Sequence, residues 1–182
     1  RLIPNMRVWR PCDAVETAVA WQDSIERANG PSSLVLTRQA LPPQPRQAGQ
    51  IAAIRRGGYV LRDADRVDLI LIAPGSEVAL AGAAADALAA KGHGVRVVSM
   101  PCPTVFAAQD AAWREAVLPA AIRHRIAIEA GVTETWHRWV GTAGRVVGLD
   151  TFGKSAPAKD LFQHFGFTPE RIAKEALELL GA

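Results

Sequence analysis

Apolar runs alternate with helix-like segments through most of the chain, and this alternation limits the possible folds most. The apolar runs lie at 59–61, 67–73, 95–100, 125–129 and 145–149. Helical patterns follow at about 77–91, 108–117, 135–140, 157–165 and 169–180. Strands spaced by helices form a sheet with helices on both faces. We therefore predict a three-layer α/β/α fold with a mainly parallel sheet, which is mixed if an edge strand runs antiparallel.

The segment before this region carries one helix and one strand. Residues 13–27 have the pattern of an amphipathic helix, which Asp13 caps with Glu16 three residues later. Its predicted inner face consists of Val15, Ala18, Val19, Gln22 and Ile25. A buried strand is predicted at 33–37. Because one helix and one strand cannot bury both faces of a sheet, we expect residues 1–41 to be the C-terminal remnant of a larger domain.

A proline-rich stretch separates the two parts. Pro42, Pro43 and Pro45 exclude a regular helix in its first half. We interpret residues 42–57 as an interdomain linker and residues 58–182 as a complete second domain.

Composition excludes several functions. The 21 Lys and Arg against 18 Asp and Glu give a net charge of +3, which is too small and dispersed to favour a nucleic-acid partner. Cys12 and Cys102 lack the spacing of a zinc site and are predicted to be reduced thiols of a cytoplasmic protein. No apolar stretch approaches the roughly 20 residues that span a bilayer, so we expect no membrane partner.

Few residues are candidates for chemistry. Arg38 ends the strand predicted at 33–37, where a guanidinium could bind a phosphate or simply be solvated. Ser76 and Glu77 follow an apolar strand and are predicted to cap a helix rather than to bind an anion. Trp136 and Trp139 are predicted to be core residues. His93, His124, His137 and His164 lack metal-site spacing, Ser155 is not in a nucleophile elbow, and Lys154 and Lys159 are predicted to be solvated.

Several segments resemble one enzyme family when taken in order. They are Val8-Trp9-Arg10-Pro11-Cys12-Asp13, Thr37-Arg38-Gln39, Gly75-Ser76-Glu77-Val78, Val97-Val98-Ser99-Met100-Pro101 and Thr151-Phe152-Gly153-Lys154-Ser155-Ala156-Pro157-Ala158. Together they resemble the C-terminal part of a transketolase, from the end of the pyrimidine-binding domain through the C-terminal domain. The family usually has Ser-Arg-Gln-Asn-Leu where this chain has Thr37-Arg38-Gln39-Ala40-Leu41, but the arginine is retained.

The resemblance implies a homodimeric, cytoplasmic enzyme of the pentose phosphate pathway. Such an enzyme transfers a two-carbon ketol unit from a ketose phosphate to an aldose phosphate, using thiamine diphosphate and a divalent cation, Mg²⁺ or Ca²⁺. It implies that Arg38 binds the substrate phosphate. The family's catalytic residues, cofactor site and metal ligands precede Arg1, so we expect none in this chain and no activity from it alone.

Two alternatives remain open at this point. A related thiamine-diphosphate enzyme, such as deoxyxylulose-phosphate synthase or the β subunit of a 2-oxo acid dehydrogenase, uses a similar last domain. The chain could also be a non-catalytic structural or dimerisation module.

Overall fold

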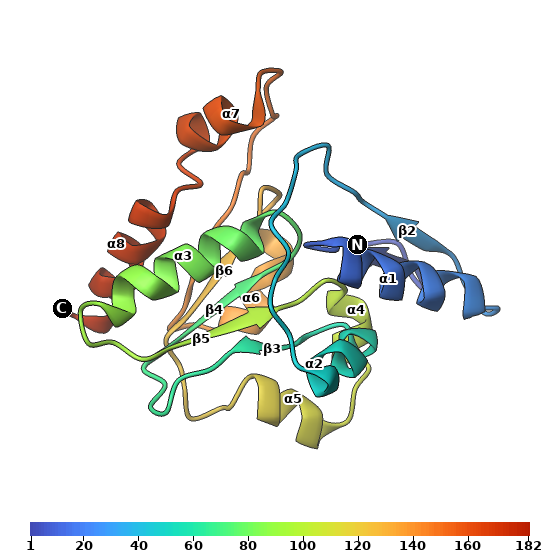
Figure 1. Ribbon diagram of the computed structural model, residues 1–182, viewed down its shortest axis with the longest axis horizontal. Coiled ribbons are helices and arrows are strands. Elements are labelled where there is room, and N and C mark those ends of the chain that lie inside the picture. The colour runs from blue at the N-terminus through green and yellow to red at the C-terminus, as the bar shows by residue number, and fades with distance from the viewer.

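The computed structural model describes residues 1–182 and contains two sheets (Figure 1). The smaller sheet pairs β1 (Arg7–Trp9) with β2 (Ser32–Leu34) in parallel, and α1 (Ala14–Glu26) connects them. Figure 1 shows this βαβ segment, in blue, beside the rest of the molecule. The predicted strand at 33–37 is therefore shorter than expected, and β1 was not predicted.

The larger sheet has the strand order β3-β5-β4-β6-β7. Its strands are β3 (Tyr59–Arg62), β4 (Leu69–Ala73), β5 (Val95–Ser99), β6 (Arg125–Ile128) and β7 (Arg145–Val147). The central strand, β4, is buried along its whole length and pairs in parallel with β5 and β6. At the edge, β3 runs antiparallel to β5. The predicted mainly parallel, mixed sheet is confirmed.

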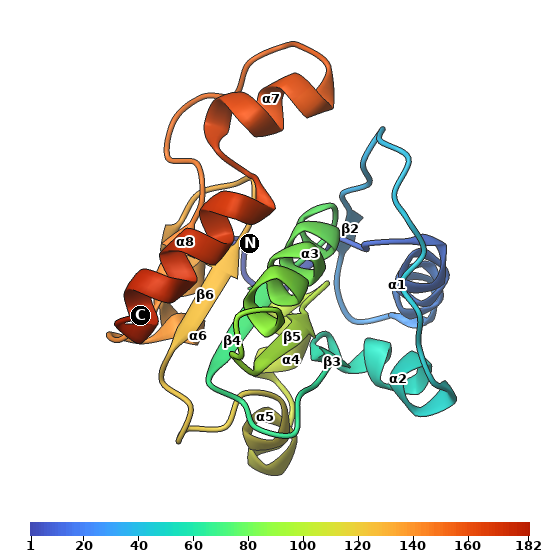
Figure 2. The same cartoon turned by 60° about the vertical axis from the view of Figure 1, so that its left-hand side comes forward.

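Helices cover both faces of the larger sheet. They are α2 (Ala48–Ala53), α3 (Glu77–Ala89), α4 (Pro103–Ala107), α5 (Ala111–Val117), α6 (His137–Val140), α7 (Ala158–Phe165) and α8 (Pro169–Leu180), with 3-10 turns η1 (Ile54–Arg56) and η2 (Glu134–Trp136). On one face α3 packs against α8, as Figure 2 shows. On the other face Phe106, Trp136 and Trp139 form a second core cluster, which confirms the two tryptophans as core residues. These two covered faces make the three layers.

Helix α1 begins where predicted but buries the opposite face. Asp13 accepts a hydrogen bond from the backbone N–H of Glu16, as a capping residue does. The buried residues are Glu16, Ala20 and Asp23, whereas Val15 and Ile25 of the predicted inner face are 37% and 77% exposed. Glu16 and Asp23 can be buried because hydrogen-bond donors on other segments satisfy their carboxylates. These bonds decide which face of α1 is buried, although the spacing of the apolar residues indicates another face.

Two further predictions are corrected in detail. The helix predicted at 108–117 begins later, as α5, because Asp110 caps it by accepting from the N–H of Trp113 at 2.7 Å. The separate helix α4 before it was not predicted. The proline-rich stretch lacks helix in its first half as predicted, but α2 and η1 occupy its second half. No helix combines the length and the apolar composition needed to cross a membrane.

Candidate functional site

Segments that follow four strands meet between the two sheets, and we call this region the junction. Arg10 follows β1, the Arg38 loop (residues 35–44) follows β2, Gly75 and Glu77 follow β4, and Glu129 follows β6. Backbone bonds join them, since the N–H of Gly75 donates to the carbonyl of Arg10 at 2.9 Å. In α/β proteins, ligands bind at the carboxyl ends of parallel strands. The junction is therefore the candidate site.

Arg38 lies in an exposed loop rather than at the end of a buried strand. Strand β2 ends at Leu34 and is only half-buried, because β1 is its sole partner. The side chain of Arg38 makes no hydrogen bond and no ion pair with the rest of the chain, so its guanidinium is available to a ligand. An apolar, β-branched run predicts a strand but does not show how far a neighbouring strand pairs with it.

The Arg38 loop is held at both ends. At its start the N–H of Val35 donates to the carbonyl of Trp9 at 2.8 Å. At its end the N–H of Gln44 donates to the carboxylate of Asp13 at 2.9 Å. Within it the hydroxyl of Thr37 accepts from the N–H of Gln39 at 3.1 Å. Arg38 thus lies on a loop that is anchored at Trp9 and at Asp13, on either side of Arg10 in the sequence.

A cavity of about 180 Å³ lies beside this loop. Its walls come from the Arg38 loop (Val35, Leu36, Thr37 and Gln39), from the turn before α3 (Gly75, Ser76 and Glu77), and from Arg10, Pro11, Ala130 and Phe162. Gly75 has φ +55, and a Cβ there would meet the guanidinium of Arg10 at 3.4 Å. That contact is an ordinary one, so it is the positive φ of this turn, rather than the approach to Arg10, that favours glycine.

Four charged side chains form a buried charge cluster in the junction: Arg1, Arg10, Glu77 and Glu129. The guanidinium of Arg10 donates to Glu77 at 3.1 Å and to Glu129 at 2.5 Å. Glu129 also accepts from Arg1 and from the indole N–H of Trp136. Glu77 is fully buried, and Ser76 occupies the N-cap position of α3 as predicted, although its hydroxyl makes no capping bond. The sequence prediction had no role for Glu129 or for Glu77 as an ion-pair partner.

Burial and pairing set the protonation of this cluster. Burial would raise the pKa of Glu129, but the guanidiniums of Arg1 and Arg10 outweigh it and lower that pKa. Burial raises the pKa of Glu77 despite the opposing charge of Arg10. With two guanidiniums facing two carboxylates, the cluster is internally paired and fixes the junction rather than offering a free acid or base.

A second buried polar group, the Glu16 network, attaches the Arg38 loop to the larger sheet. Glu16 accepts from the hydroxyls of Tyr59 at 2.7 Å and Ser99 at 2.6 Å. Arg46, just after the Arg38 loop, donates to Asp13 at 2.5 Å and to Tyr59 at 2.7 Å. The predicted linker thus contributes a buried arginine, which the proline-rich composition of this stretch did not indicate.

The remaining candidates do not gather into a reactive site. Both thiols are free and buried, and burial raises the pKa of Cys12 and of Cys102, so both are held in the unreactive thiol form. Lys154, Ser155 and Lys159 are exposed, as are His137 and His164. Within residues 1–182 no three His, Cys, Asp or Glu side chains gather as metal ligands. The residues present do not fit a diphosphate-and-cation site, and we assign no cofactor ligand to them.

The pairing of Asp13 predicts a pH dependence of stability. Burial would raise the pKa of Asp13, but bonds from Arg46 and from the N–H groups of Gln44 and Glu16 lower it below the ordinary 3.8. A carboxyl with a lowered pKa stabilises the folded chain above the unfolded value, and that contribution is lost as the pH falls below it. We expect Asp13→Asn to cost about 1–3 kcal/mol of unfolding free energy at neutral pH. The cost should shrink as the pH falls below about 4.

Denaturant unfolding at a series of pH values measures this difference. The raised pKa of Glu77 has the opposite sign, but Glu77 is present in both chains and cancels in the comparison. Asp65→Asn is the matched control, because Asp65 is exposed and unpaired. A cost of Asp13→Asn that stays constant from neutral pH to pH 3 would contradict the prediction.

Comparison with known proteins places both parts of the chain in one group. Residues 57–168 match the family described as transketolase-like TK C-terminal domain, and residues 1–44 match the transketolase pyrimidine binding domain. Transketolase 1 of Vibrio cholerae is 58% identical over 181 residues, which cover 99% of this chain and 27% of that protein. The chain therefore spans about a quarter of the length of the curated relatives it matches.

Solved structures agree with these matches. A Pichia stipitis transketolase in complex with sedoheptulose-7-phosphate superposes with a TM-score of 0.92 at 36% identity, over 100% of this chain and 26% of that chain. Leishmania mexicana transketolase gives 0.90 at 39% identity, over 98% and 26%.

Proposed function

The chain belongs to the transketolase family, and from this premise we propose that it contributes the residue that binds the phosphate group of the substrate in a transketolase. The whole enzyme would transfer a two-carbon ketol unit from a ketose phosphate to an aldose phosphate. In this proposal residues 1–41 end the pyrimidine-binding domain, residues 42–57 are the linker, and residues 58–182 form the C-terminal domain.

The observation that carries the proposal is the unpaired guanidinium of Arg38 on an anchored loop. A guanidinium binds two phosphate oxygens at once through charge-assisted hydrogen bonds. Because the loop is tied to Trp9 and to Asp13, its backbone would lose less conformational freedom on phosphate binding than an untethered loop would. The sugar phosphate bound by the Pichia stipitis relative has the same chemistry.

Arg38 would act at a distance from the reacting carbons. Thiamine diphosphate with a divalent cation, held elsewhere in the whole enzyme, supplies the electron sink for carbon–carbon bond cleavage. Binding energy from the remote phosphate orients the sugar and can lower the barrier as well as the KM. Asp13 and Arg46 hold the end of the loop, and the charge cluster fixes Arg10 beside it, so both would support this role without touching the substrate.

The oligomeric state, the cellular compartment and the pathway of the enzyme are also proposals. The family resemblance favours a homodimer in the cytoplasm that serves the pentose phosphate pathway. Exposed apolar side chains at the edge of the smaller sheet support a covered surface there, since Leu2, Ile3, Val35 and Leu36 are 87%, 62%, 48% and 51% exposed.

A ketol-transfer assay tests the proposal. The enzyme that contains this chain should form product from a ketose phosphate and an aldose phosphate only when thiamine diphosphate and Mg²⁺ are added. The 182-residue chain assayed alone should form none. Activity of the chain alone would contradict the proposal, and so would preference of the whole enzyme for a 2-oxo acid donor with an acyl acceptor.

A further inference from the structure

One buried arginine, Arg46, holds the end of the Arg38 loop. Its side chain is 2% exposed, and that of its ion-pair partner Asp13 is 3% exposed. The guanidinium of Arg46 donates to the carboxylate of Asp13 at 2.5 Å and to the hydroxyl of Tyr59 at 2.7 Å. Asp13 caps α1, and Tyr59 is the first residue of β3. A single side chain therefore ties this loop to the segments of both sheets.

The backbone of Gln44 is held on both sides. Its N–H donates to Asp13 at 2.9 Å, and its carbonyl accepts from the guanidinium of Arg46 at 3.0 Å. The N–H of Gln44 and the guanidinium of Arg46 both bond to the same oxygen, Oδ2 of Asp13. Rotation of the backbone at residue 44 would break one of these bonds, which costs free energy when the partner left behind is buried. We call Asp13, Gln44 and Arg46 the loop clamp.

No other hydrogen bond fixes the loop beyond its first residue. The N–H of Val35 bonds to strand β1, and from residue 36 to residue 43 all hydrogen bonds stay within the loop. Pro42 and Pro43 lie between Arg38 and the loop clamp, and their rings fix two φ angles there. The connection from the clamp back toward Arg38 is therefore short and stiff, so the clamp determines where this part of the loop lies.

We propose that Arg46 is a positioning residue for the transfer reaction, which sets the place of Arg38 and thereby the enzyme's preference for a phosphorylated acceptor. This inference rests on the proposed role of Arg38 as the phosphate ligand. Arg46 does not touch the substrate, because its guanidinium is buried and bonded to protein groups. A loop that is held before the ligand arrives loses less freedom on binding, so Arg38 binds phosphate more tightly.

Two variants at residue 44 test the loop clamp without removing a charge. Gln44→Pro deletes the N–H that bonds to Asp13, and Pro45 already restricts residue 44 to extended conformations that proline accepts. In the whole enzyme it should lower kcat/KM for a phosphorylated aldose about three- to tenfold, and that for an unphosphorylated aldose by less than about twofold. Gln44→Ala keeps the N–H, so this matched control should change neither value.

Two variants at residue 46 test the arginine itself. Arg46→Met keeps the length of the side chain but removes its hydrogen bonds, and it should cause at least the same selective loss as Gln44→Pro. Arg46→Lys keeps the charge beside Asp13 without the forked contacts, so its loss should be smaller than that of Arg46→Met. Because removing one partner of a buried ion pair also destabilises the fold, urea unfolding of each variant sets conditions under which it is folded.

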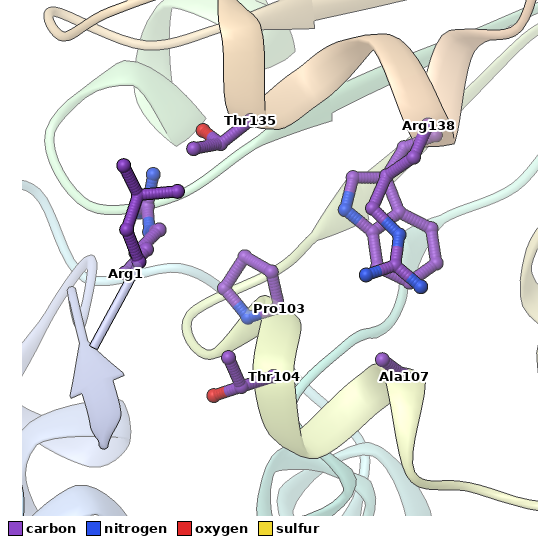
Figure 3. A pocket seen from close by; sticks show the side chains of 8 residues that line it. Arg1, Pro103, Thr104, Ala107, Thr135 and Arg138 are labelled. Atoms are coloured by element: carbon purple, nitrogen blue, oxygen red, sulfur yellow. The ribbon is translucent and has the colours of Figure 1, made fainter. Parts of the chain in front are cut away.

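An arginine at another cavity provides a remote control. A cavity of about 290 Å³ lies between α4 and the η2–α6 segment, and Figure 3 shows Arg138 and Thr135 on one side of it and Pro103 on the other. None of its lining residues belongs to the Arg38 loop or to the loop clamp. Arg138→Met should therefore leave the preference for the phosphorylated acceptor unchanged, and a loss as large as that of Arg46→Met would overturn the inference.

The Arg38→Gln background separates this inference from the proposed function. If Arg46 acts through Arg38, Arg46→Met should reduce the preference for the phosphorylated acceptor no further once Arg38 is replaced. A selective loss in Arg38→Gln with none in Gln44→Pro or Arg46→Met overturns the positioning role alone. Equal losses for both acceptors in the clamp variants, or full additivity with Arg38→Gln, also overturn it. No selective loss in Arg38→Gln itself overturns the proposed phosphate ligand, and this inference with it.

Discussion

Replacing Arg38 by glutamine in the whole enzyme should lower kcat/KM for a phosphorylated aldose by about ten- to a hundredfold. The guanidinium makes no contact with the rest of the chain, so its loss should remove ligand bonds without disturbing the fold. A hydrogen bond to a charged group contributes about 1.5–3 kcal/mol, which corresponds to that range of rates. Steady-state kinetics with varied acceptor measures the effect.

The comparison with an unphosphorylated aldose makes this prediction specific. Its kcat/KM should change little, because it lacks the group that Arg38 binds. Arg123→Gln is the matched control, since Arg123 is also exposed and unpaired. Equal losses for both acceptors, or the same loss in Arg123→Gln, would show that Arg38 does not bind the phosphate.

Replacing Glu129 by alanine should lower the unfolding free energy of this chain by about 3–5 kcal/mol. Glu129 is 3% exposed and accepts from Arg1, Arg10 and the indole of Trp136. Its removal leaves Arg10 with only Glu77, and it leaves the guanidinium of Arg1 and the buried indole N–H of Trp136 without a carboxylate acceptor. Urea unfolding followed by circular dichroism measures the loss.

Two variants calibrate that result. Glu134→Ala removes an exposed carboxylate that forms no ion pair and should change stability by less than about 0.5 kcal/mol. Glu129→Gln keeps a hydrogen-bond acceptor, so its loss of unfolding free energy should lie between those of Glu134→Ala and Glu129→Ala. A cost of Glu129→Ala below about 1 kcal/mol would mean that the charge cluster does not hold the junction together.

The larger sheet could be predicted from sequence because its signals are local. The consecutive apolar residues of β4 and the turn at Pro74-Gly75 mark strand and turn without reference to distant residues. The three residues of β1 are too few for a periodic pattern, so this strand was missed. The inner face of α1 was also mistaken, because the partners of Glu16 are Tyr59 and Ser99, far along the chain.

The ion pairs of the junction were also missed, because their partners lie far apart in the sequence. Arg10 and Glu129 are 119 positions apart, and nothing local marks either as a partner of the other. A carboxylate that follows an apolar strand, as Glu129 follows β6, is a weak signal of a buried pair, but its partner cannot be identified from spacing. Its position left Arg38 as either a phosphate ligand or a solvated side chain, the resemblance to a family favoured the first, and its role as the phosphate ligand stays a prediction.

The most direct test of the account is to replace the matching quarter of Vibrio cholerae transketolase 1 by this chain, which is 58% identical over 181 residues. We expect a folded enzyme that transfers ketol units with thiamine diphosphate and that prefers a phosphorylated to an unphosphorylated acceptor. A folded chimera without ketol transfer, or one that transfers to both acceptors equally well, would contradict the claim that this chain binds the substrate phosphate.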